Sequence, residues 1–350
     1  MATQRQTQTP ARRAGLTRHP IRTITLLAIF LFAAFLFSFS IGRYGVPVSE
    51  VVRILISRVV PIRQTWTAEM QTVVIRIRLP RIVMACLVGC SLSAAGASYQ
   101  GVFQNPMASP DILGASSGAA FGAALAILLG GSSKIITLAA FASSLVSVMA
   151  VFLIAQRAPG LRVVNLILAG IMVGSLFTAG TSYIKLVADP TNQLPEITYW
   201  MMGSLSGSKL KQVAFVVVPM AIGLVPLVLI RWQVNILTLG DEEARTLGVN
   251  TNRLRLVVIL CATLITAASV SVSGMIGWVG LVIPHLGRKL VGNNYRFLLP
   301  ASMIAGAAFL LIVDNVSRNL LAVEIPIGIL TAFVGAPFFI YLISKREKTL

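Results

Sequence analysis

The sequence predicts an all-α polytopic membrane protein with about ten transmembrane helices and both termini in the cytoplasm. Hydrophobic residues make up 56% of the chain and charged residues only 11%, whereas a soluble domain has about 25% charged residues. The mean hydropathy of +0.84 is too high for a chain that hides its apolar surface in one soluble core. The apolar residues also fall into separate segments, most of which reach the roughly 17–25 residues that a spanning helix requires.

Both ends of the chain are basic. Residues 1–20 form a basic tail that runs directly into the first apolar segment, and residues 344–350 form a second one. No small-residue cleavage site follows the first apolar segment, so a cleaved signal peptide is not expected. Because basic residues beside a span favour the cytoplasm, we expect two cytoplasmic tails and a multi-pass protein of the cytoplasmic (inner) membrane.

A single transmembrane domain is expected over residues 21–343. Its apolar segments are, in order, 21–41, 82–102, 112–130, 135–156, 163–184, 213–230, 254–272, 277–291, 297–316 and 326–343. The segment 277–291 is short and rich in glycine, and by itself it also fits a re-entrant loop. Because both tails favour the cytoplasm, the number of spans must be even, and this segment is counted as the tenth.

The net charge of +18 does not indicate a nucleic-acid partner, because the basic residues are scattered through short loops. Membrane topology explains that distribution better. The longest loop, 43–81, contains apolar residues at helical spacing over 48–58. This spacing predicts a helix at the outer membrane interface with Arg53 and Arg58 facing out. Contact with lipid head groups is the alternative explanation for these arginines.

The loop 231–253 separates two apolar segments and has the chemistry of a short helix. Asp241, Glu242 and Glu243 lie where a helix N-terminus favours negative charge, and Arg245 follows in the last turn, where positive charge is favoured. Gly248 is suited to the position just after the helix end. Two interpretations remain open from these residues: a solvated connector, or a docking surface for a soluble partner.

The residues offer little enzymatic chemistry. The chain has no Gly-x-x-x-x-Gly-Lys-Ser/Thr loop to hold phosphate, and its two histidines are too far apart in sequence for a metal cluster. Asp314 and Glu324 are expected near the outer ends of the last two spans. An ion-coupled carrier needs an acid within the membrane, and an embedded enzyme needs a polar catalytic cluster. Neither is found, although the ion-coupled secondary carrier remains the alternative function.

Several motifs, taken in order, resemble the permease subunits of the FecCD family, which are ABC importers for iron–siderophore complexes, haem and cobalamin. They are Arg78–Arg81 (RLPR), Gln104–Ala108 (QNPMA), Asp111–Gly114 (DILG), Tyr199–Gly203 (YWMMG), Leu239–Gly248 (LGDEEARTLG), Gly274–Arg288, Glu324–Gly328 (EIPIG) and Gly335–Pro337 (GAP). Each motif alone is weak, but their order along nearly the whole chain is specific. Trp278 departs from the family, which often has phenylalanine there.

The resemblance implies ten spans per subunit, a second permease subunit forming a homodimer, two cytoplasmic ATPase subunits and an external binding protein. ATP and Mg would be bound by the ATPase, and this chain would hold no cofactor or metal and would not itself be an enzyme. The residues matched to ATPase coupling are Gly240, Asp241, Glu242, Glu243, Ala244, Arg245, Leu247 and Gly248. Those matched to the inner mouth of the translocation path are Asn105, Met107, Arg162 and Val163. Candidates for docking the binding protein are Arg53, Arg58 and Arg318. The cargo is left open.

Overall fold

The computed structural model describes residues 19–42, 44–58, 60–159 and 162–346, so most of both predicted tails lies outside the described residues. Within these ranges the secondary structure is helical throughout, as predicted. The helices are α1 Pro20–Ser38, α2 Val48–Ile56, α3 Ala68–Thr72, η1 Val73–Arg78, α4 Leu79–Val102, η2 Pro110–Leu113, α5 Ala115–Leu128, α6 Ser133–Arg157, α7 Arg162–Val187, α8 Gln193–Met202, α9 Leu210–Leu229, α10 Arg231–Leu237, α11 Asp241–Thr246, α12 Thr251–Ser273, α13 Val279–Val291, α14 Tyr295–Asn319 and α15 Ile327–Arg346.

Each of the ten predicted apolar segments coincides with one of these helices. Six of them, α1, α6, α7, α9, α12 and α14, are long and apolar enough to cross a membrane, and α5 and α15 are shorter apolar helices. The short segment 277–291, whose inclusion brings the predicted number of spans to ten, is α13, with 13 residues. Such a helix is about 20 Å long, which is shorter than the hydrocarbon core of about 30 Å. The fold is therefore a polytopic helical membrane protein, and the count of ten spans stays a prediction.

Helix α4 lies at the centre of the bundle, with α9, α12, α13 and α14 around it. Glycines allow two of these neighbours to approach closely. A Cβ on Gly89 would lie 2.2 Å from the carbonyl oxygen of Gly306 in α14, and one on Gly96 would lie 1.8 Å from that of Gly280 in α13. Side chains at these positions would push the helices apart, so the small residues fix the contact distances around α4.

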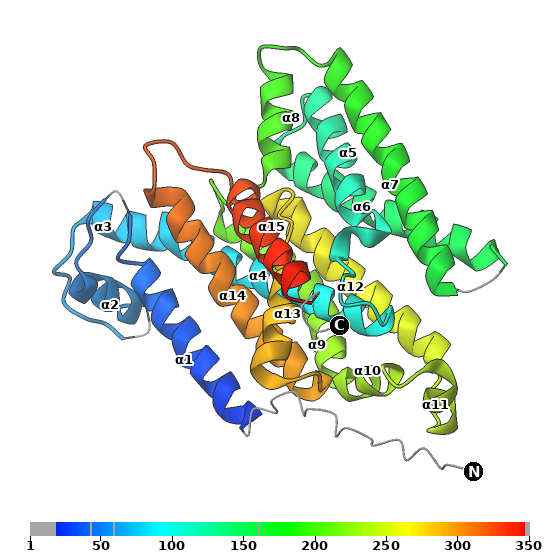
Figure 1. Ribbon diagram of the computed structural model, residues 1–350. Coiled ribbons are helices and arrows are strands. Elements are labelled where there is room, and N and C mark those ends of the chain that lie inside the picture. Colours follow the sequence, from blue (N-terminus) through cyan, green and yellow to red (C-terminus); the bar gives the residue numbers. More distant parts are fainter. Residues whose placement is uncertain (1–18, 43, 59, 160–161, 347–350) are drawn as a thin grey trace, which may run out of the picture.

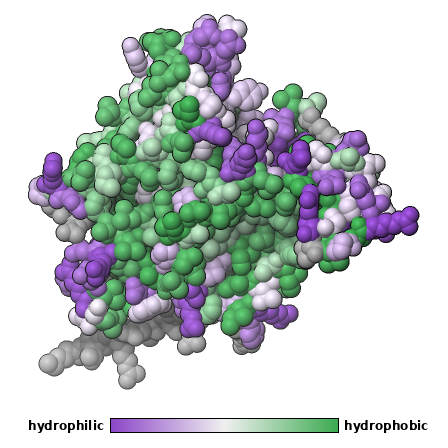
Figure 2. All heavy atoms as spheres, turned by 180° about the vertical axis from the view of Figure 1, so that it is seen from behind, coloured by the Kyte–Doolittle hydropathy of each residue, from purple (hydrophilic) through white to green (hydrophobic). Residues whose placement is uncertain are grey.

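The outer surface of the bundle is apolar. Figure 2 shows a broad hydrophobic area on one face, with hydrophilic residues gathered towards its rims. Large exposed side chains contribute to this surface from several helices, among them Phe32 on α1, Leu176 on α7 and Ile222 on α9. A contiguous apolar surface of this kind is unusual for a soluble monomer and is the surface that lipid requires.

The shorter helices gather at two ends of the bundle (Figure 1). Helices α10 and α11 lie together at the lower edge of the view, whereas α2 and α3 lie at the left and α8 at the top. We refer to the end with α10 and α11 as the α11 end, and to the opposite end, with α2, α3 and α8, as the α2 end. All the residues predicted as functional lie at one end or the other.

Candidate functional site

The helix predicted between Gly240 and Gly248 is present as α11 at the α11 end. It ends in a Schellman motif. Gly248 adopts a positive φ of 80°, its N–H donates to the carbonyl of Arg245 at 2.9 Å, and the N–H of Val249 donates to the carbonyl of Ala244 at 3.0 Å. This confirms the prediction that Gly248 follows the helix end.

Among the side chains of α11 that the structure describes, only that of Ala244 is buried. Ala244 is fully buried, within the hydrophobic cluster that contains Leu237 of α10 and Leu254 of α12. Glu242, Glu243, Arg245 and Leu247 are exposed, and the side chain of Asp241 lies outside the described residues. A small amphipathic helix thus projects charge and the apolar Leu247 away from the bundle.

Hydrogen bonds join the segment around α10 to the bundle. The side-chain amide of Gln104, just after α4, donates to the carbonyl of Leu237 at 2.6 Å. The backbone N–H of Tyr295 in α14 donates to Oδ1 of Asn235 at 3.3 Å. One turn further into the bundle, Arg288 of α13 donates to Oε1 of Gln100 at 2.6 Å. The α11 end therefore depends on short-range polar contacts between α4, α10, α13 and α14.

The residues predicted for an inner mouth lie on two different elements at this end. Asn105 and Met107 belong to the turn after α4, where Oδ1 of Asn105 accepts a hydrogen bond from the N–H of Met107 at 2.9 Å. Both side chains are exposed. Val163 is half-buried in the first turn of α7, and the side chain of Arg162 lies outside the described residues. Val163 packs on the same hydrophobic cluster as Phe103 and Ala108, which flank the turn.

The three arginines predicted to dock a partner are all at the α2 end, but they differ in exposure. Arg53 and Arg58 lie on or just after α2, as predicted, and both are exposed. Arg53 forms an ion pair with Glu50 at 3.4 Å, with 49% of its side chain exposed. Arg318 is only 10% exposed and pairs with Asp314 at 3.2 Å. The nearby acid Glu324 binds Arg81 instead.

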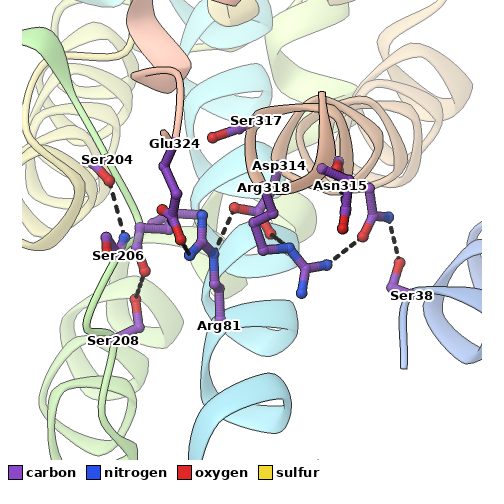
Figure 3. Close-up of polar contacts among 12 residues, drawn as sticks. Ser38, Arg81, Ser204, Ser206, Ser208, Asp314, Asn315, Ser317, Arg318 and Glu324 are labelled. Atoms are coloured by element: carbon purple, nitrogen blue, oxygen red, sulfur yellow. Dashed lines mark hydrogen bonds and ion pairs between the residues drawn. The ribbon is translucent and has the colours of Figure 1, made fainter. Parts of the chain in front are cut away.

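A buried ionic network at the α2 end was not predicted (Figure 3). Nε of Arg81 in α4 donates to Oδ1 of Asp314 in α14 at 2.8 Å. Nη1 of Arg81 donates to both carboxylate oxygens of Glu324, at 2.9 and 3.0 Å. Asp314 is fully buried and lies between the guanidinium groups of Arg81 and Arg318. Asp314 lies near the end of α14, as expected, but its complete burial between two guanidinium groups was not predicted.

The network also holds the connection between α14 and α15. Glu324 lies in that connection, and the hydroxyl of Ser317 donates to the carbonyl of Ile325 at 2.6 Å. On the other side Arg318 donates to Asn315, whose side-chain amide donates to the hydroxyl of Ser38 in α1 at 2.6 Å. The network thus connects α1, α4, α14 and the segment that leads into α15. The only hint in the sequence was four ionisable residues in apolar surroundings.

Within the described residues, no group of three or more His, Cys, Asp or Glu side chains is suited to a metal ion. The fold is that of a polytopic helical membrane protein, and comparison with known proteins identifies the family. The sequence pattern of the FecCD transport family matches residues 28–345. The chain therefore belongs to the FecCD transport family, and it is a permease of the ABC transporter type.

Relatives with assigned roles are similar over most of their length. The molybdate import system permease protein MolB of Haemophilus influenzae is 38% identical over 322 residues, which cover 92% of this chain and 95% of MolB. The cobalamin import system permease protein BtuC of Halobacterium salinarum is 43% identical over 278 residues, covering 79% and 74%. The hemin transport system permease protein HmuU of Yersinia pestis is 38% identical over 285 residues, covering 78% and 84%.

A solved structure is also similar. It is described as an inward-facing conformation of a transporter assigned to the metal-chelate type of ABC transporters. It superimposes with a TM-score of 0.83 at 37% sequence identity, and the match covers 93% of this chain and 99% of the solved chain. The architecture described above is thus the architecture of a known transporter class.

Proposed function

We propose that this chain is the membrane-spanning permease subunit of a binding-protein-dependent ABC importer in the cytoplasmic membrane. It spans the membrane ten times with both termini in the cytoplasm, so the α11 end is cytoplasmic and the α2 end is external. Two copies of the chain form the path, two partner subunits bind and hydrolyse ATP with Mg, and an external protein delivers the cargo. Family membership and the relatives named for import systems support this proposal.

The observation that carries the proposal is helix α11. A helix of six residues in which Ala244 is the one buried side chain among those described contributes little to the stability of its own bundle. Its exposed Glu242, Glu243 and Arg245, together with Leu247, suit a polar cleft with an apolar floor on a soluble partner. Gly240 and Gly248 delimit the helix, so that the whole helix can bind in the cleft of the partner. In this proposal α11 is where closure of the ATPase is converted into movement of the permease.

The other predicted residues take their roles from the same topology. The turn with Asn105 and Met107 and the start of α7 with Arg162 and Val163 lie at the cytoplasmic mouth of the path. On the external side Arg53 and Arg58 contact acidic residues of the binding protein. Arg318 has a smaller share in docking, because 10% of its side chain is exposed and Asp314 already neutralises its charge.

The proposed cargo is a metal chelate, such as an iron–siderophore complex, haem or cobalamin. Relatives named for hemin and cobalamin support this class, and the relative named for molybdate extends it to a metal oxyanion. The cognate binding protein decides between them. Titrating it with hemin, cyanocobalamin, ferric citrate and molybdate should give tight binding for one of these four compounds and weak binding for the rest.

An ion-coupled secondary carrier is the alternative that Asp314 brings back, because a buried acid is what such a carrier uses. Two guanidinium groups already bind this carboxylate, which leaves no free charge for a coupling ion. The test is uptake into vesicles that contain the permease and its ATPase. Uptake that requires internal-face ATP and persists without any ion gradient supports the importer. Uptake driven by a proton or sodium gradient without ATP would overturn it.

A further inference from the structure

The end of helix α4 contains a residue in an unusual backbone conformation. Gln104 follows the helix and adopts a positive φ of 49°. Its N–H donates to the carbonyl of Gly101 at 3.3 Å, and the N–H of Asn105 donates to the carbonyl of Gln100 at 3.2 Å. These two bonds define a Schellman motif, in which the left-handed position is usually glycine because a Cβ is unfavourable there.

Helix α11 ends in the same motif and follows the usual rule, with Gly248 in the left-handed position. The two motifs lie at the same end of the bundle and differ in this one residue. A glutamine in place of glycine at the end of α4 is locally unfavourable. Its side chain must therefore supply something that glycine cannot.

The side chain of Gln104 caps a second helix. Its Nε2 donates at 2.6 Å to the carbonyl oxygen of Leu237, the last residue of α10. The same carbonyl accepts the N–H of Gly240 at 3.4 Å, and Gly240 is the residue from which α11 starts. Close packing reinforces this contact, since a Cβ on Gly101 would lie 2.7 Å from the side chain of Val234 in α10.

On its other side Gln104 is bonded covalently to the turn of Asn105 and Met107. That turn is internally fixed, because Asn105 accepts the N–H of Met107 on its side chain at 2.9 Å and the N–H of Ala108 on its carbonyl at 3.1 Å. Ala108 is fully buried. A displacement of Gln104 therefore moves the turn as one body rather than being absorbed within it.

We propose that Gln104 is the positioning residue that transmits displacement of α10 and α11 to the turn of residues 105–108. The inference rests on the proposed function, in which the ATPase moves α11 and the turn narrows the cytoplasmic mouth. When α10 shifts, the Leu237 carbonyl carries the Gln104 amide with it, and the end of α4 and the turn follow.

Two substitutions at this position separate its side chain from its backbone. Gln104→Met keeps the length of the side chain but has no N–H to donate. Gln104→Gly removes the side chain and relieves the strain of the left-handed backbone. It therefore tests whether the Schellman motif alone, without the side-chain bond, transmits the displacement to the turn.

The chain offers a closely matched control at the α2 end. Nε2 of Gln193 in α8 donates at 3.0 Å to the carbonyl oxygen of Leu128, the last residue of α5. Gln193→Met thus removes the same kind of bond from a glutamine to a helix end, together with the bond that Oε1 of Gln193 accepts from the N–H of Asp189 at 3.0 Å, but away from α10, α11 and the turn.

The reporter is a cysteine at Met107, introduced after Cys86, Cys90 and Cys261 are replaced by alanine. Its rate of maleimide labelling is measured in the complete complex with its ATPase, without nucleotide and after trapping with ATP and vanadate. ATP hydrolysis is measured on the same samples. We expect the nucleotide-dependent change in labelling to fall by about fivefold in Gln104→Met, the factor that one neutral hydrogen bond supplies. Hydrolysis should continue, and Gln193→Met should keep the full change.

The outcomes separate this inference from the proposed function. A full labelling change in Gln104→Met or in Gln104→Gly would overturn the inference, because the side-chain bond would then be unnecessary. An equal loss in Gln193→Met would also overturn it, since any lost helix cap would have the same effect. If the complex with native Gln104 shows no change in labelling with nucleotide although it hydrolyses ATP, the proposed function fails and the inference with it.

Discussion

The two ends of the bundle are held together by different kinds of interaction. At the α2 end a fully buried carboxylate, Asp314, lies between the guanidinium groups of Arg81 and Arg318. At the α11 end the bonds that hold α10 against the segment after α4 and against α14 are single hydrogen bonds between neutral groups, such as that from Gln104 to Leu237. Removing one partner of a buried ion pair costs about 3–5 kcal/mol, whereas a neutral hydrogen bond contributes about 1 kcal/mol.

This difference indicates which end can rearrange. The charged network fixes α1, α4, α14 and the connection to α15 relative to one another, and it cannot open without exposing bare charges to an apolar interior. The contacts of α10 and α11 can be exchanged at small cost. A transporter that receives energy at the α11 end and presents a constant surface at the α2 end needs this distribution of rigidity. The predictions below test it, from the largest expected effect to the smallest.

The largest effect is expected from Asp314→Asn. The substitution leaves Arg81 and Arg318 buried without a full counter-charge, and the loss of stability should be about 3–5 kcal/mol. Thermal unfolding of the purified protein in detergent measures it. In the triple variant Arg81→Met, Asp314→Leu and Arg318→Met no buried charge of the network remains, so its melting temperature should lie above that of Asp314→Asn. If Asp314→Asn were as stable as the parent, the network would not be a rigid support.

Charge reversal on α11 should affect coupling and leave stability almost unchanged. Glu242 and Arg245 are exposed, so Glu242→Arg or Arg245→Glu removes complementarity to the ATPase without disturbing the bundle. Transport per ATP hydrolysed should fall at least about fivefold, the lower end of typical coupling energies. The control is Glu196→Arg, which reverses an exposed acid on α8 at the α2 end. Retention of the ATPase subunit during purification is measured as well, and the Glu196→Arg permease should retain it. If Glu196→Arg lost the ATPase as readily as the two α11 variants, docking at α11 would be contradicted.

The smallest effect is expected at the external surface. Exposed charge pairs contribute about 0.2–1 kcal/mol and act more on the association rate than on affinity. Arg53→Glu and Arg58→Glu should slow association with the binding protein about two- to fivefold at low salt and flatten its salt dependence, with basal ATP hydrolysis intact. Surface-based association kinetics at two ionic strengths provides the measurement, with Lys134→Glu on α6 as the matched exposed cation. Unchanged kinetics would favour lipid contact for both arginines.

Much of the fold could be predicted from the sequence because lipid leaves few choices for an apolar segment. The segment 254–272 corresponds to α12, Thr251–Ser273, and the other nine segments also coincide with helices. The helix between Gly240 and Gly248 was predictable for a different reason. Its charges follow the helix dipole, and Gly248 supplies the left-handed residue, so all its signals are local.

The polar contacts could not be predicted, because their partners are far apart in the chain. Arg81 is 233 residues from Asp314 and 243 from Glu324. Hydropathy placed Asp314 near a helix end, and only the packing of α4 against α14 shows that it is enclosed. The role of Gln104 is hidden for a similar reason. Glutamine disfavours the left-handed backbone conformation that Gln104 adopts. The reason for this conformation becomes clear only from the hydrogen bond of its side chain to the carbonyl of Leu237.

The most direct test of the difference between the two ends compares one cysteine at each. Leu247 beside α11 is 61% exposed and Tyr199 on α8 is 58% exposed, so Leu247→Cys and Tyr199→Cys should react equally with maleimide in the isolated permease. In the complete complex with its ATPase, we predict that the cysteine at 247 becomes protected while the one at 199 reacts as before. Equal labelling of both in the complex, or protection at 199 instead, would contradict the assignment of α11 as the surface through which ATP drives this permease.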